Sequence, residues 1–279
     1  MSAVTTWPAP AKLNLFLQVT GRRGDGYHDL QTVFQLIDLA DEIQIQVRRD
    51  GLIERQAGPE GVPAEADLIV RAARALQAVS GSPLGADLGV TKRIPLGGGL
   101  GGGSSDAATV LVALNRLWNC GLNEDELAAI GVDLGSDVPV FVRGRSAWAE
   151  GRGERLTPVE LPDRAFVVLH PRVHVPTAAL FQAPELTRNS PPITMTGFLQ
   201  SGGRNDFEPV VRARYPQVAQ ALDWLGHFAP ARLTGTGSCI FAPCPSLNEA
   251  QDIVSRVPAP WRGMAARGMN VSPLLALRP

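Results

Sequence analysis

The stretch PLGGGLGGGSSDAATVLVAL, residues 95–114, decides how this chain is interpreted. Six of the chain's 29 glycines fall within residues 97–103, and the apolar spacing of a helix follows over about residues 104–118. Glycines lack Cβ atoms, so several backbone N–H groups can converge on one anion, and a helix N-terminus adds unpaired donors and partial positive charge. Ser104 and Ser105 add hydroxyls that can bind phosphate oxygens or Mg²⁺. The pattern therefore predicts a triphosphate site.

The predicted phosphate-binding residues act through their backbone or hydroxyl groups. They are Pro95, Leu96, Gly97, Gly98, Gly99, Leu100, Gly101, Gly102, Gly103, Ser104 and Ser105.

Two common nucleotide motifs do not fit this loop. A P-loop ends in Gly-Lys-Ser/Thr, and this run has no lysine. Gly97, Gly99 and Gly102 satisfy the dinucleotide fingerprint, but such a match is almost automatic in so glycine-rich a run. The acidic residues about twenty positions later, Glu124 and Asp125, follow a helix rather than a second strand. A flexible linker is the remaining alternative, and the β-like segment before the loop and the helix after it disfavour a linker.

Length and composition bound the class of protein. The chain has 279 residues, of which 44% are hydrophobic and 19% charged, with a net charge of −1. These values exclude a disordered chain, a coiled coil and an electrostatically driven nucleic-acid binder. We expect neither a membrane span nor a signal peptide, because no apolar run is long enough and the N-terminus lacks the signal pattern. Three scattered cysteines indicate a reducing cytoplasm. They are Cys120, Cys239 and Cys244.

The mixture of strands and helices, without strict alternation, predicts an α+β fold in two lobes. The Pro-rich segment at 156–164 is the candidate boundary, which gives an N-terminal domain of residues 1–158 and a C-terminal domain of 159–279. The expected strands are 11–20, two within 30–48, 86–94, a hairpin over 138–150, one from 165 and one at the end of the chain. The expected helices are 67–80 with Asp67 as its N-cap, 104–118, 123–131, 216–228 and 247–256.

Lysine is rare in this chain. Lys12 and Lys92 are the only two lysines among 26 basic residues, and the other 24 are arginine. A lysine kept against this bias is a candidate for chemistry that the broad, planar guanidinium of Arg cannot supply, although chance is the alternative. Lys92, just before the glycine loop, either lines the nucleotide site or lies on the surface.

Three segments together resemble the GHMP kinase superfamily: PAKLNLFL at 10–17, PLGGGLGGGSSDAA at 95–108 and LTGTGSCIF at 233–241. The late glycines Gly235 and Gly237 either approach the phosphates or form a turn. Within the superfamily, the Gly-Tyr-His of residues 26–28 resembles the branch that acts on a cytidine diphosphate-linked alcohol. Further segments similar to that branch are GSDVPVFVRGRSAWAEGRGE at 135–154 and HPRVHVPTAALF at 170–181, so the resemblance covers nearly the whole chain.

The resemblance implies a two-lobed GHMP kinase fold, with ATP in the N-terminal lobe and the acceptor between the lobes. The implied reaction moves the γ-phosphoryl group of ATP to the tertiary 2-hydroxyl of a methylerythritol moiety, a step in the non-mevalonate route to isoprenoid precursors. Mg²⁺ is the expected charge neutraliser, with Ser105 as its candidate ligand. The expected partner is a small cytidyl molecule, not nucleic acid or membrane. Monomer and homodimer both remain open.

The resemblance also assigns roles to individual residues. It makes Asp137 the general base and Lys12 the ammonium beside it, although an aspartate before Val-Pro can equally be a helix cap. Tyr27 and Phe181 are the expected stacking walls for cytosine, and His28 the expected partner of its edge, with an exposed loop histidine as the alternative. The predicted acceptor-binding residues are Asn14, Tyr27, His28, Thr177 and Phe181.

Two other functions compete with this one. The first is a superfamily kinase for mevalonate, homoserine or a sugar, which Tyr27, His28 and Phe181 disfavour because those acceptors have no base to stack. The second is a non-catalytic nucleotide-binding member, which the presence of both Lys12 and Asp137 disfavours.

Overall fold

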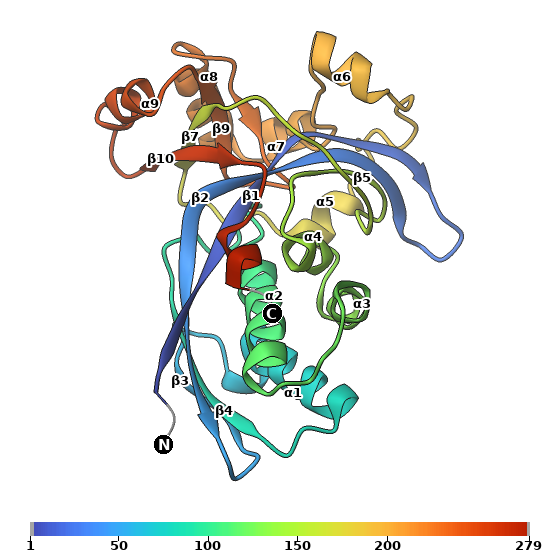
Figure 1. Ribbon diagram of the computed structural model, residues 1–279. Helices are drawn as coiled ribbons and strands as arrows, with labels where there is room; N and C mark the ends of the chain where they lie inside the picture. Colours follow the sequence, from blue (N-terminus) through green and yellow to red (C-terminus); the bar gives the residue numbers. More distant parts are fainter. Residues whose placement is uncertain (1–2, 278–279) are drawn as a thin grey trace.

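A long antiparallel strand pair forms the spine of the molecule, seen in blue in the computed structural model of Figure 1, which describes residues 3–277. Strand β1 (Thr5–Arg22) pairs with β2 (His28–Arg48) along almost its whole length. The other edge of β2 pairs in turn with β5 (Ala147–Gly151), β10 (Arg262–Met269) and β4 (Gly85–Thr91). One mixed sheet therefore runs through both halves of the chain.

The remaining strands extend this sheet at its ends. They are β3 (Ile53–Ala57), parallel to β4; β6 (Arg155–Pro158), beside β5; β7 (Ala165–His170), beside β10; and β9 (Ile240–Cys244) and β8 (Arg232–Leu233) beyond β7. The helices are α1 (Leu68–Ser80), α2 (Gly102–Leu117), α3 (Glu124–Leu134), α4 (Val138–Arg143), α5 (Thr177–Phe181), α6 (Met195–Ser201), α7 (Glu208–Arg214), α8 (Pro216–Gly226) and α9 (Leu247–Val254). Short 3₁₀ turns lie at Ala64–Ala66 and Pro273–Leu277.

Two large hydrophobic clusters fill the two lobes. One contains side chains of β2, β4, α1 and α2, and the other contains side chains of β7, β9, α7 and α8. The predicted α+β fold is confirmed. The predicted domain boundary falls between β6, which ends at Pro158, and β7, which begins at Ala165. The sheet nevertheless crosses that boundary, because β10 pairs with β2 at Ile37 and Leu36.

The expectation of two strands within residues 30–48 was wrong, because β2 is continuous. The charged residue Asp41 lies in the middle of β2. In the fold its side chain is buried and accepts hydrogen bonds from the backbone N–H groups of Arg93 and Ile94. A carboxylate that is satisfied in this way does not have to leave the sheet.

The hairpin expected over residues 138–150 was also wrong. VPVFV forms most of helix α4, which begins at Val138. Pro139 fits its first turn without the loss of a hydrogen bond, because the first N–H groups of a helix have no partner within it. Its residues Val138–Val142 are buried in the fold. Burial against α2 and α3 outweighs the β-propensity of Val and Phe. The strand expected after this segment is present as β5.

The helix starts predicted from local signals fit better. Asp67 caps α1, and its side chain accepts the N–H of Ile69. Helix α2 begins at Gly102, two residues before its predicted start, after Gly101 in a left-handed conformation with φ 72°. The second half of the glycine cluster therefore belongs to the first turn of α2.

Candidate active site

The glycine loop, defined here as residues 95–101, is fixed through its carbonyl groups. The backbone N–H of Cys239 donates to Gly98 O at 3.1 Å, and the backbone N–H of Lys12 donates to Leu100 O at 3.0 Å. Within residues 3–277, the N–H groups of residues 97–101 donate no backbone hydrogen bond. A loop whose carbonyls are used and whose N–H groups are free is suited to bind an anion.

The late glycine segment, residues 233–239, packs directly on this loop. A Cβ atom on Gly99 would lie 2.3 Å from Thr234 O, and one on Gly235 would lie 3.1 Å from Gly99 O. Both Gly99 and Gly235 must therefore lack a side chain for the two segments to pack this closely. The backbone N–H of Gly237 donates to Thr234 O at 3.0 Å, so Gly235 lies in a turn, and this turn packs against the loop.

Lys12 lies at the centre of the site and is 3% exposed. Its Nζ lies 3.0 Å from Gly99 O, 2.6 Å from Asn14 Oδ1 and 3.2 Å from Asp137 Oδ2. The ammonium has three N–H donors, so each of these oxygens can be served at once. A Cβ atom on Gly101 would lie 3.2 Å from Lys12 Cε, so a wider side chain at position 12 would have little room.

Asp137 enters the site from the turn between α3 and α4. Its carboxylate is 29% exposed, in contrast to its buried partner Lys12. The backbone N–H of Val138 donates to Gly135 O, which makes the turn tight. An ammonium at 3.2 Å and partial access to solvent leave this carboxylate able to accept a proton from a bound hydroxyl.

The two serines after the glycine loop differ in direction. Ser105 is fully buried and its hydroxyl donates to Pro10 O at 2.6 Å, so the predicted metal ligand is taken up by β1. Ser104 is half-buried, and its Oγ lies 3.5 Å from the position of a Cβ atom on Gly135. Successive residues of a helix point about 100° apart, so only one of the two faces the Asp137 turn. In this structure the Ser105 hydroxyl is thus bound to β1, and Ser104 is the serine that lies near the Asp137 turn.

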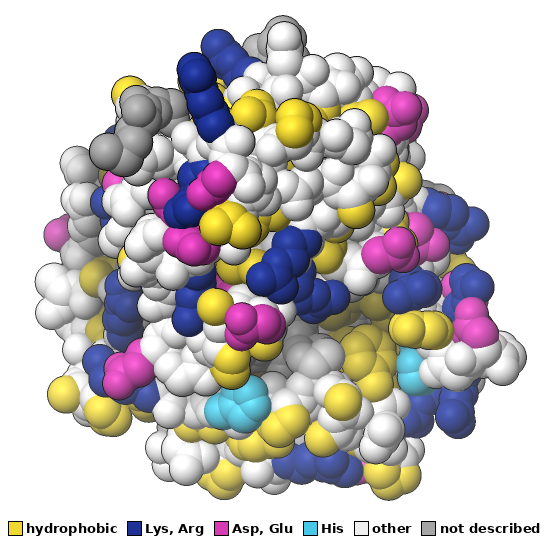
Figure 2. Space-filling model, turned by 90° about the horizontal axis from the view of Figure 1, so that it is seen from below, with side chains coloured by type: hydrophobic (Ala, Val, Ile, Leu, Met, Phe, Trp, Pro, Cys, Tyr) yellow, Lys and Arg dark blue, Asp and Glu magenta, His cyan; other side chains and the backbone are white. Residues whose placement is uncertain are grey.

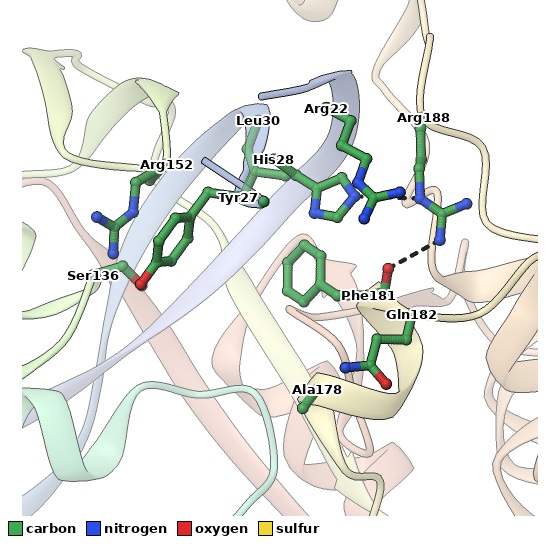
Figure 3. Close-up of a pocket in the computed structure, with 11 residues that line it drawn as sticks. Arg22, Tyr27, His28, Leu30, Ser136, Arg152, Ala178, Phe181, Gln182 and Arg188 are labelled. Atoms are coloured by element: carbon green, nitrogen blue, oxygen red, sulfur yellow. Dashed lines mark hydrogen bonds between the residues drawn. The ribbon is translucent and has the colours of Figure 1, made fainter. Parts of the chain in front are cut away.

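A pocket of about 580 Å³ brings together three of the predicted acceptor residues. Figure 3 shows the rings of Tyr27 and Phe181 on opposite sides of a gap, with His28 above Phe181. Tyr27 is 51% exposed, so its ring is available to a ligand. Ser136, the neighbour of Asp137, lines the same pocket, which therefore leads from the aromatic rings toward the Lys12–Asp137 pair.

His28 is buried rather than an exposed loop residue. Its ring stacks on Phe181 with centroids 5.2 Å apart, and Arg188 Nε donates to its Nε2 at 3.2 Å. Burial lowers the pKa of His28, and the charges of Arg188 and Arg22 lower it further. The neutral ring accepts at Nε2, so its proton resides on Nδ1, where it can be donated to a ligand.

Asn14 and Thr177 have other partners in this structure. Asn14 accepts from Lys12, and its Nδ2 donates to Thr32 Oγ1 at 3.0 Å. The hydroxyls of Thr177 and Thr236 lie 2.8 Å apart, which ties α5 to the late glycine segment. Both residues lie close to the site, but the Asn14 side chain is hydrogen-bonded to Lys12 and does not line the pocket.

Some residues around the loop were not predicted from the sequence. Thr234 accepts the backbone N–H of Asn14 at 2.9 Å. The Nδ1 atom of His174 lies 3.3 Å from the position of a Cβ atom on Gly97, so this histidine borders the loop. Both residues occur in segments that had been singled out, LTGTGS and HPRVHVPT, but nothing in those letters indicates contact with the loop.

Lys92 lies beside the start of α2, directly after the glycine loop. Its Nζ contacts both Asp41 and Asp106, the latter at 2.6 Å, and lies 3.3 Å from the position of a Cβ atom on Gly102. Burial raises the pKa of Asp106 to about 7, with Lys92 opposing and Asp41 adding to the shift. The pKa of Lys92 is raised because the two carboxylates outweigh its burial. Lys92 is therefore not a free surface lysine.

Figure 2 shows a hollow near the middle of one face of the molecule, with hydrophobic side chains inside it and Lys or Arg side chains along part of its rim. Positive charge is thus gathered locally in a chain whose net charge is −1. None of the helices formed by residues 3–277 is both long and apolar enough to cross a membrane.

Comparison with known proteins accounts for this arrangement. The family model "GHMP kinases N terminal domain" matches residues 67–145, and "GHMP kinases C terminal" matches residues 193–263. The 4-diphosphocytidyl-2-C-methyl-D-erythritol kinase of Alkalilimnicola ehrlichii is 56% identical over 275 residues, covering 99% of this chain and 94% of that protein. The enzyme of the same name from Halorhodospira halophila is 56% identical over 277 residues, covering 98% and 96%.

The chain belongs to this kinase family. A crystal structure of a 4-(cytidine 5'-diphospho)-2C-methyl-D-erythritol kinase, 34% identical, superposes with a TM-score of 0.84 over 95% of this chain and 99% of that one. The mevalonate kinase of Methanococcus jannaschii, 16% identical, superposes with a TM-score of 0.71 over 96% and 99%. That second likeness extends to the fold alone, which the kinase family therefore shares with the wider group of GHMP kinases.

Proposed function

We propose that this chain transfers the γ-phosphoryl group of ATP to the 2-hydroxyl of 4-diphosphocytidyl-2-C-methyl-D-erythritol, the reaction of its family in the non-mevalonate pathway. One observation carries the assignment of the transfer site. Lys12 Nζ lies 3.2 Å from Asp137 Oδ2 and 3.0 Å from Gly99 O, so a single ammonium joins the candidate base to the phosphate loop.

Asp137 and Lys12 divide the chemistry between them. The acceptor hydroxyl oxygen attacks the γ-phosphorus, its proton passes to a carboxylate oxygen of Asp137, and the bond from the γ-phosphorus to the bridging oxygen breaks to release ADP. Lys12 orients the hydroxyl and offsets the negative charge on the transferring group. A preorganised cation in a buried site is effective because it needs no rearrangement during the reaction.

The phosphates are bound by the free N–H groups of the glycine loop and by the first turn of α2. The Ser104 hydroxyl lies near the Asp137 turn, where it can also contact a phosphate. Mg²⁺ fits this donor set, because it commonly takes one or two protein oxygens and fills its remaining positions with phosphates and water. Ser104 would hold it, and when bound it would neutralise charge on the phosphate oxygens.

Cytosine fits between Tyr27 and Phe181, whose rings lie on opposite sides of the pocket. The Nδ1–H of neutral His28 is suited to donate to an acceptor atom on the base. Asn14 positions Lys12, and Thr177 positions the helix that ends in Phe181. These assignments place the base in one part of the pocket and the alcohol at Asp137.

The division into domains of residues 1–158 and 159–279 and a cytoplasmic location complete the proposal. The loop between β6 and β7 and the separate hydrophobic clusters of the two lobes support the division. The scattered free cysteines are consistent with a reducing compartment.

A coupled ADP-release assay tests the reaction. Purified protein is given ATP, Mg²⁺ and either the cytidyl acceptor, mevalonate, homoserine or galactose, and we expect turnover with the cytidyl acceptor only. Faster turnover with any other acceptor would refute the proposed substrate. Asp137→Asn should lower kcat by about two to four orders of magnitude. Asp133→Asn, an exposed carboxylate on the preceding helix, is the matched control and should leave kcat unchanged.

A further inference from the structure

The acceptor pocket has a positive lining. Arg22, Arg152 and Arg188 contribute to it, and no Asp or Glu lies among the described residues that line it. A base and a neutral sugar alcohol give these guanidinium groups no charge to pair with. Such a lining favours a ligand that carries negative charge between its two ends.

Arg188 is occupied by the protein itself. It donates to the carbonyl groups of Leu186, Phe181 and Ala183 and to Nε2 of His28. Four hydrogen bonds leave little capacity for a ligand out of five donors. Arg188 therefore fixes the wall of the pocket and does not supply the missing contact.

Arg152 is differently placed. Its guanidinium carbon lies 3.8 Å from the centroid of the Tyr27 ring, a close cation–π contact. The residue is half-buried, and none of the described residues forms a hydrogen bond or ion pair with its side chain. A guanidinium can stack through its face while its N–H groups, which lie in its plane, remain free to donate.

Arg152 lies between the residues proposed to bind the base and those proposed to bind the alcohol. Figure 3 draws Arg152 and Ser136 on one side of the Tyr27 ring and Phe181 on the other. Ser136 directly precedes Asp137. Arg22, by contrast, lies beside His28 and Arg188, away from the Asp137 turn. Arg152 and the residue that precedes the candidate base therefore line the same side of the pocket.

We infer that Arg152 determines specificity for a diphosphate-linked acceptor: it supports Tyr27 from behind and donates its N–H groups to the diphosphate. This inference rests on the proposed function, since a base at Tyr27 and an alcohol at Asp137 leave the diphosphate between them. The planar fork of Arg matches two phosphate oxygens at once, which a lysine ammonium does not.

Competitive inhibition by CDP and by cytidine separates this role from a structural one. Both ligands carry the base, but only CDP carries the diphosphate. We expect Arg152→Met to reduce the preference for CDP over cytidine, measured as the ratio of their inhibition constants, by about ten- to a hundredfold, the effect of losing one charge-assisted pair of hydrogen bonds. Acceptor KM should rise by a similar factor, with kcat and ATP KM within threefold of wild type. Arg152→Lys should fall between.

Arg155→Met is the matched control, because Arg155 is an exposed arginine three residues away that does not line this pocket. Its CDP-to-cytidine ratio should equal that of wild type. An unchanged ratio in Arg152→Met, with normal melting temperature, would overturn the inference. Wild-type turnover is the separate check on the proposed function: if the wild type does not phosphorylate the cytidyl acceptor, it is the reaction assignment that has failed.

Discussion

Replacing Asp106 by Asn should change how stability depends on pH. Asp106 is 4% exposed, its Oδ2 contacts Lys92, and its Oδ1 is buried without a partner. Asn keeps one carbonyl oxygen for Lys92 and removes a charge that lies close to Asp41. Because the pKa of Asp106 is raised from 3.8 to about 7 by its burial, the folded state holds a proton there that the unfolded state releases.

The sign and size follow from this difference. Below pH 3.8 both states are protonated, so the stability linked to this proton is fully present. It declines as pH rises through the window between 3.8 and 7, and it is lost above 7. Between pH 5 and pH 8, stability changes only over the part of this window from pH 5 to about pH 7, which is about two pH units. At 1.36 kcal/mol per unit, the free energy of unfolding of the wild type falls by about 3 kcal/mol relative to that of Asp106→Asn. This corresponds to a change on the order of 5–11 °C in the melting-temperature difference.

Thermal unfolding of both proteins at pH 5, 6, 7 and 8 measures this change. The difference between variant and wild type is compared across pH, so other titrating groups cancel. Asp163→Asn, which removes an exposed carboxylate between β6 and β7, should give a pH-independent difference. A melting-temperature difference for Asp106→Asn that is equal at pH 5 and pH 8 would refute the reasoning about the buried carboxylate.

Three further predictions concern the active site. Lys12→Arg should lower kcat at least about a hundredfold despite keeping the charge, because Gly101 and Phe141 leave no room for a guanidinium; more than half of wild-type kcat would contradict this. Tyr27→Ala should raise acceptor KM about tenfold, the scale of one lost stacking contact, with ATP KM unchanged. Acceptor KM should stay flat from pH 8 to 6.5 and rise at more acidic pH, because the pKa of His28 is lowered by burial and by Arg188 and Arg22. In His28→Gln, acceptor KM should not rise at acidic pH.

Local signals were sufficient for the phosphate loop and its helix. Glycine freedom, an N-terminal cap and helical apolar spacing act over a few residues, so they can be recognised without knowing what lies beside them. The cap of α1 at Asp67 and the loop before α2 are of this kind. The roles of Lys12 and Asp137 came from resemblance rather than from spacing, since 125 positions separate them in the sequence.

The errors arose where a distant partner decides the outcome. The sequence does not show that Asp41 can stay within one continuous strand, because the N–H groups that satisfy its carboxylate belong to residues about fifty positions later. The residues of VPVFV favour a strand by their own propensity. The burial against α2 and α3 that makes the segment helical is a property of the assembled fold. The directions of Ser104 and Ser105 could not be predicted either, because successive helical residues point about 100° apart and only the assembled fold places the Ser105 hydroxyl on β1.

The scarcity of lysine now has a structural interpretation. Lys12 and Lys92, the two lysines of the chain, lie on either side of the glycine loop, near Gly101 and Gly102. Each places a compact ammonium between oxygen acceptors in a space bounded by backbone: Gly99 O, Asn14 and Asp137 for Lys12, and Asp41 and Asp106 for Lys92. A guanidinium is wider and directs its donors in one plane, so it is less suited to acceptors that surround a single point. The geometry around the loop therefore supplies a reason to keep lysine at both positions in a chain that otherwise uses arginine.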